Sequence, residues 1–298
     1  MRCFHCVAGA AALMLALLSA CSVQHPAAAS PFTQPWINAT GAAEPETQVQ
    51  RYDADTFVIR QSIRTNFEGP FLYLLFGHDR VLLLDSGAGG LQIRTSVTNV
   101  INGWLAEHHR ASIPLVVAHS HSHHDHVAGD PEFSAQSDVT VVGLAPAEVA
   151  AFFGMQHWPE DTATFDLGGR TLDIIATPGH EPSQIMVYDR RTRLLLTGDA
   201  LYPGRLYFPR AEFATYRAGI DRAVAFTATH PVRFILGAHI EMTRTPGQDY
   251  PMRADSHPDE HVLELPYSSL IELKSALQAM GATPVRDGHA DFIVYPRP

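Results

Sequence analysis

The sequence predicts a layered α/β fold, and two observations carry this prediction. Segments rich in Val, Ile and Leu alternate along the chain with segments whose apolar residues recur at helical spacing. Histidine and aspartate residues follow directly after several of the predicted strands. Chemistry-bearing residues at strand ends are typical of layered α/β proteins, in which a rigid sheet positions the functional loops.

Two stretches of the chain share one plan. Residues 71–87 (FLYLLFGHDRVLLLDSG) contain two apolar runs separated by a polar turn, and the second run leads into Asp85. Residues 184–199 (QIMVYDRRTRLLLTGD) repeat this plan and end in Asp199. Each stretch is expected to form a β-hairpin that delivers an aspartate at the end of a strand. The repeat suits a fold built from two similar halves.

The remaining elements follow from apolar spacing and β-branched content. Helices are expected over residues 91–109, 212–228 and 268–279. Strands are expected over residues 113–120, 139–144, 171–177, 232–239 and 292–295. The polar segment 239–266 fits either a substrate loop or a contact between subunits. The sequence leaves the role of residues 240–298 and the oligomeric state open.

The N-terminal residues have the pattern of an export signal. Arg2 precedes an apolar run over residues 7–18, and small residues lead to Cys21. Such a run is a secretory signal (residues 1–20) that is too short for a permanent membrane span. The ending LSAC resembles the lipobox of bacterial lipoproteins, which implies lipid attachment at Cys21; the alternative is an ordinary signal peptide.

The lipobox resemblance implies a place in the cell envelope, on the periplasmic face. Ser22 follows Cys21, which favours the outer membrane. Membrane contact is expected through the lipid anchor alone. Residues 21–55, rich in Ala, Pro, Ser, Thr and Gln, are predicted to be a flexible tether, and residues 56–298 the folded domain.

Composition narrows the classes of ligand and of site. The formal net charge of −10 argues against nucleic acid as a partner, because phosphate binding relies on clustered cations. The three cysteines are Cys3, Cys6 and Cys21, and the first two leave with the signal. With Cys21 acylated, the mature domain has no free thiol. Any metal site must then use nitrogen and oxygen ligands.

The densest cluster of titratable groups lies in AHSHSHHDHVAG, residues 118–129, directly after a predicted strand. It contains the pattern H-x-H-x-D-H. In an extended segment residues two apart face the same way, so His121 and His123 can converge on one ion. A turn would carry Asp125 and His126 toward a second point. Imidazole nitrogens and carboxylate oxygens are good zinc ligands.

Three further residues, His180, Asp199 and His239, stand at predicted strand ends. A single histidine in such a place is more often solvated or hydrogen-bonded than bound to a metal. Together with the H-x-H-x-D-H stretch, however, the three supply the additional ligands that two ions need. The set predicts a metal cage.

In this order the residues resemble the metallo-β-lactamase superfamily, over roughly residues 55–240. The resemblance implies an αβ/βα four-layer sandwich with the metals at the edge between two sheets. It also divides the ligands between two ions. The first ion would bind His121, His123 and His180, the second Asp125, His126 and His239, and Asp199 would bridge both. Asp85 would orient the histidine loop from behind.

The resemblance implies a hydrolase with two Zn²⁺ ions, although nitrogen and oxygen ligands also suit iron or manganese. A pair of such ions makes a shared hydroxide at neutral pH and polarises the bond under attack. Asp125 would orient that hydroxide or relay its proton. Either Tyr202 or Tyr207 would donate a hydrogen bond to the substrate oxyanion, as a tyrosine does in some lactonases; the alternative for both is simple packing.

The expected substrate is a small molecule with an ester, lactone or related acyl bond. The ligand set is similar to those of glyoxalase II and lactonases, although the glutathione-binding region of glyoxalase II is not recognisable. Three alternatives remain open: hydrolysis of β-lactams, an iron-dependent oxidoreductase on the same fold, and a metal-binding lipoprotein without catalysis.

Overall fold

The computed structural model describes Met1 and residues 30–298. The body of the predicted signal peptide and Cys21 therefore lie outside the described residues. Within residues 30–298, no helix has the length and apolarity needed to cross a membrane.

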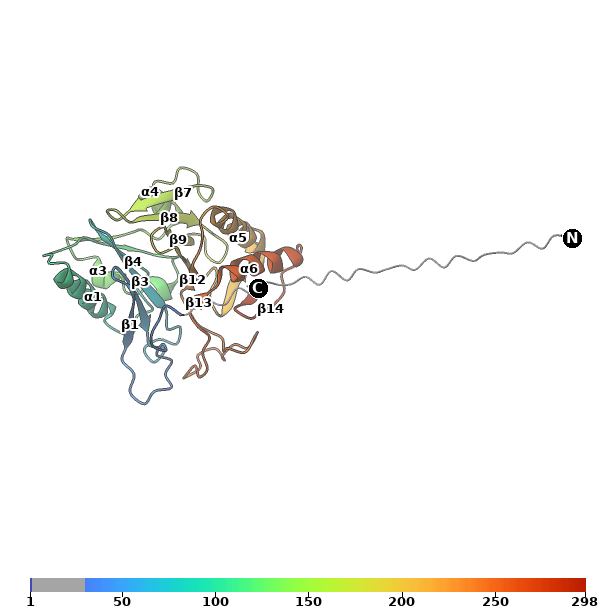
Figure 1. The fold of residues 1–298 in the computed structure, drawn as a ribbon, viewed down its shortest axis with the longest axis horizontal. Helices are drawn as coiled ribbons and strands as arrows, with labels where there is room; N and C mark the ends of the chain where they lie inside the picture. The colour runs from blue at the N-terminus through green and yellow to red at the C-terminus, as the bar shows by residue number, and fades with distance from the viewer. Residues whose placement is uncertain (2–29) are drawn as a thin grey trace.

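Two six-stranded sheets form the centre of the molecule (Figure 1). The first sheet has the order β1-β2-β3-β4-β5-β6, with β1 Thr47–Asp53, β2 Thr56–Gln61, β3 Phe71–Phe76, β4 Val81–Leu84, β5 Leu115–Ala118 and β6 Val139–Val141. The second has the order β13-β12-β10-β9-β8-β7, with β7 Thr162–Asp166, β8 Thr171–Ala176, β9 Ile185–Asp189, β10 Leu194–Gly198, β12 Phe234–Gly237 and β13 Glu264–Leu265. A small third sheet has the order β11-β15-β14, with β11 Arg205–Pro209, β14 Asp287–Gly288 and β15 Ile293–Arg297.

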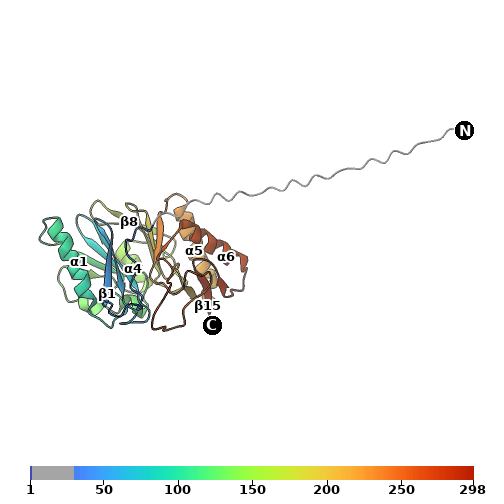
Figure 2. The same cartoon turned by 60° about the horizontal axis from the view of Figure 1, so that its bottom comes forward.

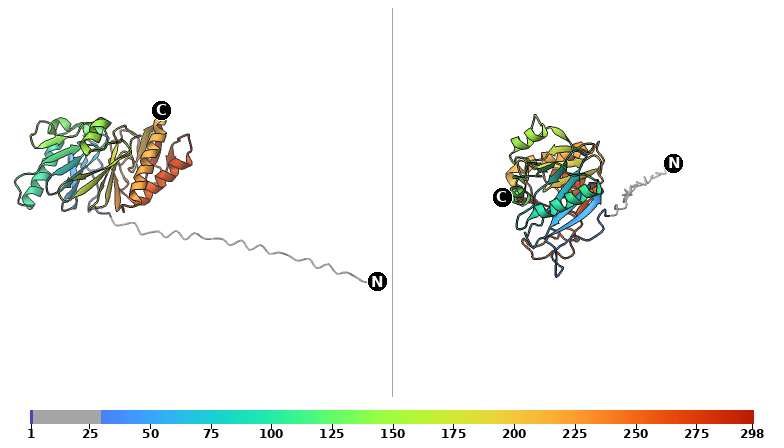
Figure 3. Two further views of the ribbon diagram at one scale, coloured as in Figure 1. Left: turned by 90° about the horizontal axis from the view of Figure 1, so that it is seen from above. Right: turned by 90° about the vertical axis from the view of Figure 1, so that its left-hand side faces the viewer.

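Helices cover the outer faces of both sheets. α1 (Ile93–Glu107) packs on the first sheet, and α5 (Phe213–Thr227) and α6 (Tyr267–Ala279) pack on the second. Figures 2 and 3 show the resulting order of helix, sheet, sheet and helix. The shorter helices are α2 His124–Val127, α3 Asp130–Phe133, α4 Pro146–Phe153 and the 3-10 turn η1 Arg210–Glu212. The predicted four-layer sandwich is confirmed.

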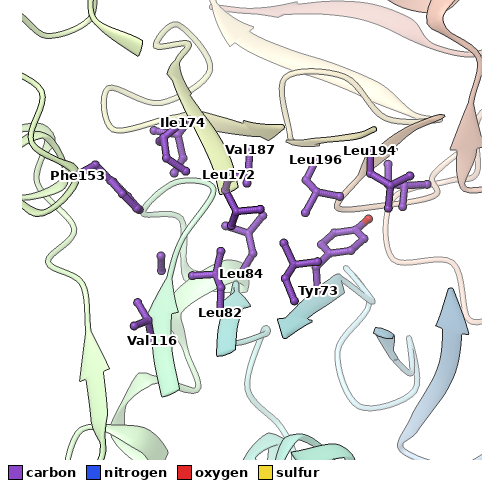
Figure 4. Packing of buried hydrophobic residues seen from close by; sticks show 14 of the residues in the cluster. Tyr73, Leu82, Leu84, Val116, Phe153, Leu172, Ile174, Val187, Leu194 and Leu196 are labelled. Atoms are coloured by element: carbon purple, nitrogen blue, oxygen red, sulfur yellow. The ribbon is translucent and has the colours of Figure 1, made fainter. Parts of the chain in front are cut away.

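The strands are apolar because both of their faces are buried. Along β3, Tyr73 and Leu75 point into the core between the sheets, whereas Leu74 and Phe76 belong to the core under α1. Figure 4 shows the inner core, in which Leu82 and Leu84 of the first sheet meet side chains of the second. Each fully buried side chain of this kind stabilises the fold by about 1.5–3 kcal/mol.

The prediction that residues 21–55 form a tether is wrong over its described part. β1 pairs antiparallel with β2, with Thr47 opposite Gln61. Upstream of it, Phe32 is buried and the ring of Trp36 meets that of Phe71 edge-on at 5.0 Å. β1 is an edge strand with one buried residue, Gln50, so no apolar period marks it in the sequence. Its backbone ladder holds it, and isolated aromatic residues anchor the segment before it.

Parallel pairing brings the functional loops to one edge of the sandwich. β4 runs parallel to β5, and β10 runs parallel to β12. The carboxyl ends of these four strands lead into Asp85, the histidine loop, Asp199 and His239 respectively. The loops of the two sheets also touch: a Cβ added at Gly198, whose φ is +51°, would lie 2.5 Å from Cβ of Ser120. Only glycine allows this approach.

Candidate metal centre

Three histidines form the first cluster of ligand atoms. Nε2 of His121 lies 3.0 Å from Nδ1 of His123 and 3.2 Å from Nε2 of His180. Nε2 of His180 lies 2.9 Å from Nδ1 of His123. The side chains of His121 and His180 are buried, whereas His123 is exposed. The three nitrogens thus face one point, which is open to solvent on the side of His123.

The second cluster combines two carboxylates with two imidazoles, all buried. Oδ2 of Asp125 lies 3.2 Å from Nε2 of both His126 and His239. Oδ1 of Asp199 lies 3.3 Å from Nε2 of His239 and 3.5 Å from Nε2 of His126. The two histidine nitrogens are 3.4 Å apart.

Asp199 faces both clusters at once. While Oδ1 belongs to the second cluster, Oδ2 lies 3.6 Å from Nε2 of His180 and 4.0 Å from Nε2 of His121. Oδ1 is buried and has no hydrogen-bond partner among the described residues. A buried carboxylate oxygen without a partner is costly, so this oxygen is suited to a cation.

The donor set fits divalent metal ions. Ligands about 2.0–2.2 Å from a tetrahedral zinc ion lie about 3.3–3.5 Å from one another. The spacings within both clusters are close to this range. Nitrogens and oxygens of this kind bind zinc, iron and manganese alike, so the geometry supports a metal without choosing one.

Hydrogen bonds on the far side of the imidazole rings fix the direction of the ligand nitrogens. Nδ1 of His180 bonds the carbonyl of Tyr207 at 2.6 Å, and Nδ1 of His239 bonds the carbonyl of Glu68 at 2.9 Å. Nδ1 of His126 bonds Oδ2 of Asp85 at 3.0 Å. A ring that donates from Nδ1 presents the lone pair of Nε2 to the centre, as a metal ligand must.

Asp85 lies directly behind the histidine loop. Its Oδ1 accepts the backbone N–H of Ser120 at 2.6 Å, and its Oδ2 accepts the Ser120 hydroxyl at 3.0 Å as well as His126. The residue adopts φ of +69°, which is uncommon outside glycine. Backbone strain of this kind persists where the surroundings fix it, and here the loop that it holds carries ligands to both clusters.

The ionisation states suit metal binding. Burial opposes the charged form of Asp125 and Asp199, but His126 and His239 outweigh it and hold the pKa of both carboxyls well below the usual range. Burial, reinforced by His126, lowers the pKa of His121 well below its ordinary value, so that ring is neutral. Cations that bind here would displace protons from His126 and His239, whose pKa values the carboxylates raise despite burial.

The two candidate tyrosines contact the surroundings of the cage in different ways. Tyr202 is buried, and its hydroxyl donates to the carbonyl of Arg205 and lies 3.0 Å from Oε2 of Glu241. That hydroxyl is thus engaged outside both clusters, which favours the packing alternative over the oxyanion donor. The ring of Tyr207 lies under the guanidinium of Arg297, 3.6 Å from it, and its contact with the cage is through its carbonyl.

Sequence reasoning missed the main-chain partners of the cage. The carbonyls of Glu68 and Tyr207 hold two ligands, yet any residue type offers a carbonyl, so no sequence signal marks them. The sequence pattern also gives no role to His119. Nε2 of that buried side chain lies 2.8 Å from Oδ1 of Asp130, which accepts the Ser86 hydroxyl too.

The sequence model of the metallo-beta-lactamase superfamily matches residues 66–239, more than half of the chain. The chain belongs to the metallo-beta-lactamase superfamily. The matched region contains every residue of the two clusters and ends at His239.

Known members of the superfamily resemble the chain at low identity. The bovine acyl-coenzyme A thioesterase MBLAC2 is 24% identical over 200 residues, which cover 56% of this chain and 72% of that protein. The probable metallo-hydrolase YqgX of Bacillus subtilis is 26% identical over 149 residues, or 44% of this chain and 66% of that one. A hydroxyacylglutathione hydrolase of Brucella anthropi is 32% identical over 91 residues, which cover 30% of this chain and 35% of that protein.

Solved structures agree on the fold. A metallo-beta-lactamase from Pontibacter korlensis superposes with a TM-score of 0.52 at 16% identity, covering 78% of this chain and 99% of that one. At this identity the likeness shows the fold alone. Family membership together with the hydrolase relatives makes this protein a metallo-beta-lactamase superfamily hydrolase.

Proposed function

We propose that the protein is a dinuclear-metal hydrolase that cleaves an ester, lactone or related acyl bond of a small molecule. The observation that carries the proposal is Asp199, whose two carboxylate oxygens face two separate clusters of ligand atoms. One ion would be held by His121, His123 and His180, the other by Asp125, His126 and His239. Zinc is the proposed metal, with iron or manganese as alternatives.

When bound, two such cations make water nucleophilic at neutral pH and polarise the carbonyl under attack. The chain provides the remaining functions. Asp125 contacts Nε2 of both His126 and His239 through Oδ2. Its carboxylate would orient the attacking water or relay a proton to the leaving group. The exposed His123 marks the side from which substrate enters.

The choice of acyl substrates rests on two kinds of support. The relatives found by sequence include proteins named as an acyl-coenzyme A thioesterase and hydroxyacylglutathione hydrolases, both of which cleave thioesters. The ligand set contains aspartate at the bridging position and no cysteine. β-Lactam hydrolysis is the second candidate, because solved structures of β-lactamases share the fold.

Turnover of a substrate panel tests this proposal. The panel consists of a chromogenic ester, a lactone, a thioester and a cephalosporin, each measured with chelator and after addition of zinc, manganese or iron. We expect chelator-sensitive turnover that zinc restores, fastest with an ester, lactone or thioester. Turnover of the cephalosporin alone would select the second candidate. Absence of chelator-sensitive turnover of any compound would contradict the proposal.

We further propose that lipid on Cys21 anchors the enzyme to the cell envelope, as the LSAC sequence indicates. Expression in a bacterium with a labelled fatty acid should label the wild-type protein, which should sediment with membranes. Cys21→Ala should remain unlabelled. Label on the Ala variant, or none on the wild type, would contradict the anchor.

A further inference from the structure

The segments that follow Asp199 and His239 are joined by ion pairs of the buried Arg205 with the half-buried Glu241 and, at 3.5 Å, with Asp249. Arg205 and Glu241 meet through Nη2 and Oε1 at 3.1 Å and through Nε and Oε2 at 3.2 Å. The backbone N–H of Arg205 also donates to Oε2, at 3.0 Å. The Arg205 side chain is 10% exposed and that of Glu241 21%. Glu241 stands two residues after His239, and Arg205 six residues after Asp199.

Further hydrogen bonds hold this pair in place. The backbone N–H of Glu241 donates to the carbonyl of Pro203 at 2.8 Å, and Nη1 of Arg205 donates to the carbonyl of Tyr250 at 2.8 Å. The Tyr202 hydroxyl lies against the same carboxylate oxygen that Arg205 contacts. The polar segment after His239, whose role the sequence leaves open, is thus bonded to the loop after Asp199 through Glu241, Asp249 and Tyr250.

The joined segments touch three ligands that come from three different loops. Asp199 is the first residue of the loop. The ring of Tyr202 packs edge-on against the ring of His239, with centroids 5.5 Å apart. Tyr207, two residues after Arg205, accepts the hydrogen bond from His180 through its carbonyl. Movement of Arg205 would therefore be transmitted to ligands of both clusters.

The backbone approaches Tyr202 closely at two glycines. A Cβ added at Gly237 would lie 2.3 Å from Cβ of Tyr202, and one added at Gly204 would lie 2.4 Å from the edge of its ring. Glycine at both positions lets the backbone close on the ring. Tyr202 is therefore packed against the backbone of β12 as well as bonded to the Arg205–Glu241 pair.

We propose that Arg205 and Glu241 are positioning residues for the metal centre: their ion pair sets the relative places of His180, Asp199 and His239 and thereby the affinity for metal. The inference rests on the proposed dinuclear site, but not on the identity of the substrate. Loss of a partner that orients metal ligands typically lowers metal affinity by about 10–100-fold.

A matched control exists in the same region of the chain. Arg60 and Glu260 form a second buried pair, with Nη1 to Oε2 at 2.5 Å and Nη2 to Oε1 at 2.6 Å. Neither side chain bonds a cage ligand or a carbonyl that holds one. Glu260→Gln therefore weakens a second charge pair whose side chains make no hydrogen bond to a cage ligand, although Glu260 lies in the segment after His239 and pairs with Thr243 in an isolated bridge.

The test is the zinc affinity of full-length variants, measured by competition with a chromophoric chelator. We expect Glu241→Gln to lower the affinity about 10–100-fold and Glu260→Gln to change it less than about threefold, while both lower the melting temperature of the metal-free protein. Arg205→Lys, which keeps the charge but loses the two-pronged contact, should lie between wild type and Glu241→Gln.

Two results would overturn the inference: wild-type zinc affinity in Glu241→Gln, or an equal loss in Glu241→Gln and Glu260→Gln, which would reduce the pair to a structural role. Arg205→Lys provides the readout if Glu241→Gln does not fold. Because the measurement is of zinc binding, an enzyme that binds zinc normally but cleaves no acyl compound would contradict the proposed function alone.

Discussion

The two ends of the sandwich both bury charged groups but satisfy them in different ways. At the end where β10 finishes, three histidines surround one point, and two aspartates and two histidines surround another. The contacts described above between neighbouring ligand atoms within these clusters range from 2.9 to 3.5 Å. At the end where β10 begins, the guanidinium of Arg170 donates to Oδ2 of Asp189 at 2.6 Å, to Oγ1 of Thr56 at 2.7 Å and to the carbonyl of Asp55 at 2.6 Å. We call this second group the Arg170 cluster.

The difference separates a site for an ion from a structural tie. In the Arg170 cluster opposite charges meet directly and both Nη nitrogens are hydrogen-bonded, although Nε has no partner among the described residues. The cluster joins β2 of the first sheet to β9 of the second. At the cage, ligand atoms from several side chains converge on two points, and Oδ1 of Asp199 lacks a hydrogen-bond partner among the described residues. Substitutions at the cage should therefore affect activity, and substitutions at the Arg170 cluster should affect stability.

The largest effect is expected from Asp199→Asn. The amide keeps the shape of the side chain but removes the charge that faces both clusters, and several kcal/mol of electrostatic stabilisation are at stake. We expect kcat/KM for the best substrate of the panel to fall at least about 100-fold. Asp221→Asn, at an exposed ion pair with Lys274, is the control and should leave kcat/KM unchanged. An Asp199→Asn enzyme within tenfold of wild type would contradict the bridging role.

The matching change at the other end is Asp189→Asn. It leaves the charge of Arg170 buried without its counterion, which should lower the free energy of unfolding by about 3–5 kcal/mol. Urea unfolding of the metal-free protein measures this, and Asp221→Asn should cost less than about 1 kcal/mol. The folded fraction of Asp189→Asn should retain wild-type kcat/KM. An Asp189→Asn protein that is as stable as wild type but inactive would contradict the purely structural role of the Arg170 cluster.

Acid should weaken the Arg170 cluster in a defined pH range. Burial raises the pKa of Asp189, but hydrogen bonds from Arg170 and Thr192 and the Arg170 charge outweigh this and hold it below its ordinary value of 3.8. The carboxylate thus contributes stability that is present above pH 3.8 and is lost as the pH falls through the depressed pKa of the folded state. The stability gap between wild type and Asp189→Asn should be constant from pH 6 to 8 and shrink below about pH 4. A stability difference between wild type and Asp189→Asn that grows below pH 4 would contradict the lowered pKa of Asp189.

The smallest effect is expected from Tyr202→Phe. The ring remains against His239, and only the hydrogen bonds to Glu241 and the Arg205 carbonyl are lost. We expect kcat/KM to fall less than about threefold, whereas removal of an oxyanion donor costs about 100–1,000-fold. Steady-state kinetics on the ester of the panel distinguishes the two. A 100-fold loss of kcat/KM in Tyr202→Phe would instead support the oxyanion-donor role that the sequence predicts for Tyr202.

The sequence predicted the layered α/β elements well because periodic apolar runs and strand-end residues are local signals, and the family resemblance supplied the four-layer arrangement. The two hairpins occur as β3–β4 and β9–β10, and the expected helix over 91–109 is α1. His121, His123, Asp125 and His126 stand close together in one loop, so their order alone carries information. His180, Asp199 and His239 could be added because each follows a recognisable strand.

The parts that could not be predicted depend on contacts between distant residues or on the backbone. The Arg170–Asp189 and Arg205–Glu241 pairs are formed by residues that no local pattern connects. The edge strand β1 has too few buried side chains to show a period. Tyr202 was assigned from its place in a loop near the site, but the direction of its hydroxyl is set by Glu241, far along the chain.

The proposed centre holds two ions that share Asp199, and anomalous diffraction from zinc-soaked crystals tests this most directly. Data collected on both sides of the zinc absorption edge should show two peaks per chain, about 3.5–4 Å apart, one beside His121, His123 and His180 and one beside Asp125, His126 and His239. Asp199 should contact both. A single peak, or two peaks remote from Asp199, would contradict the dinuclear centre.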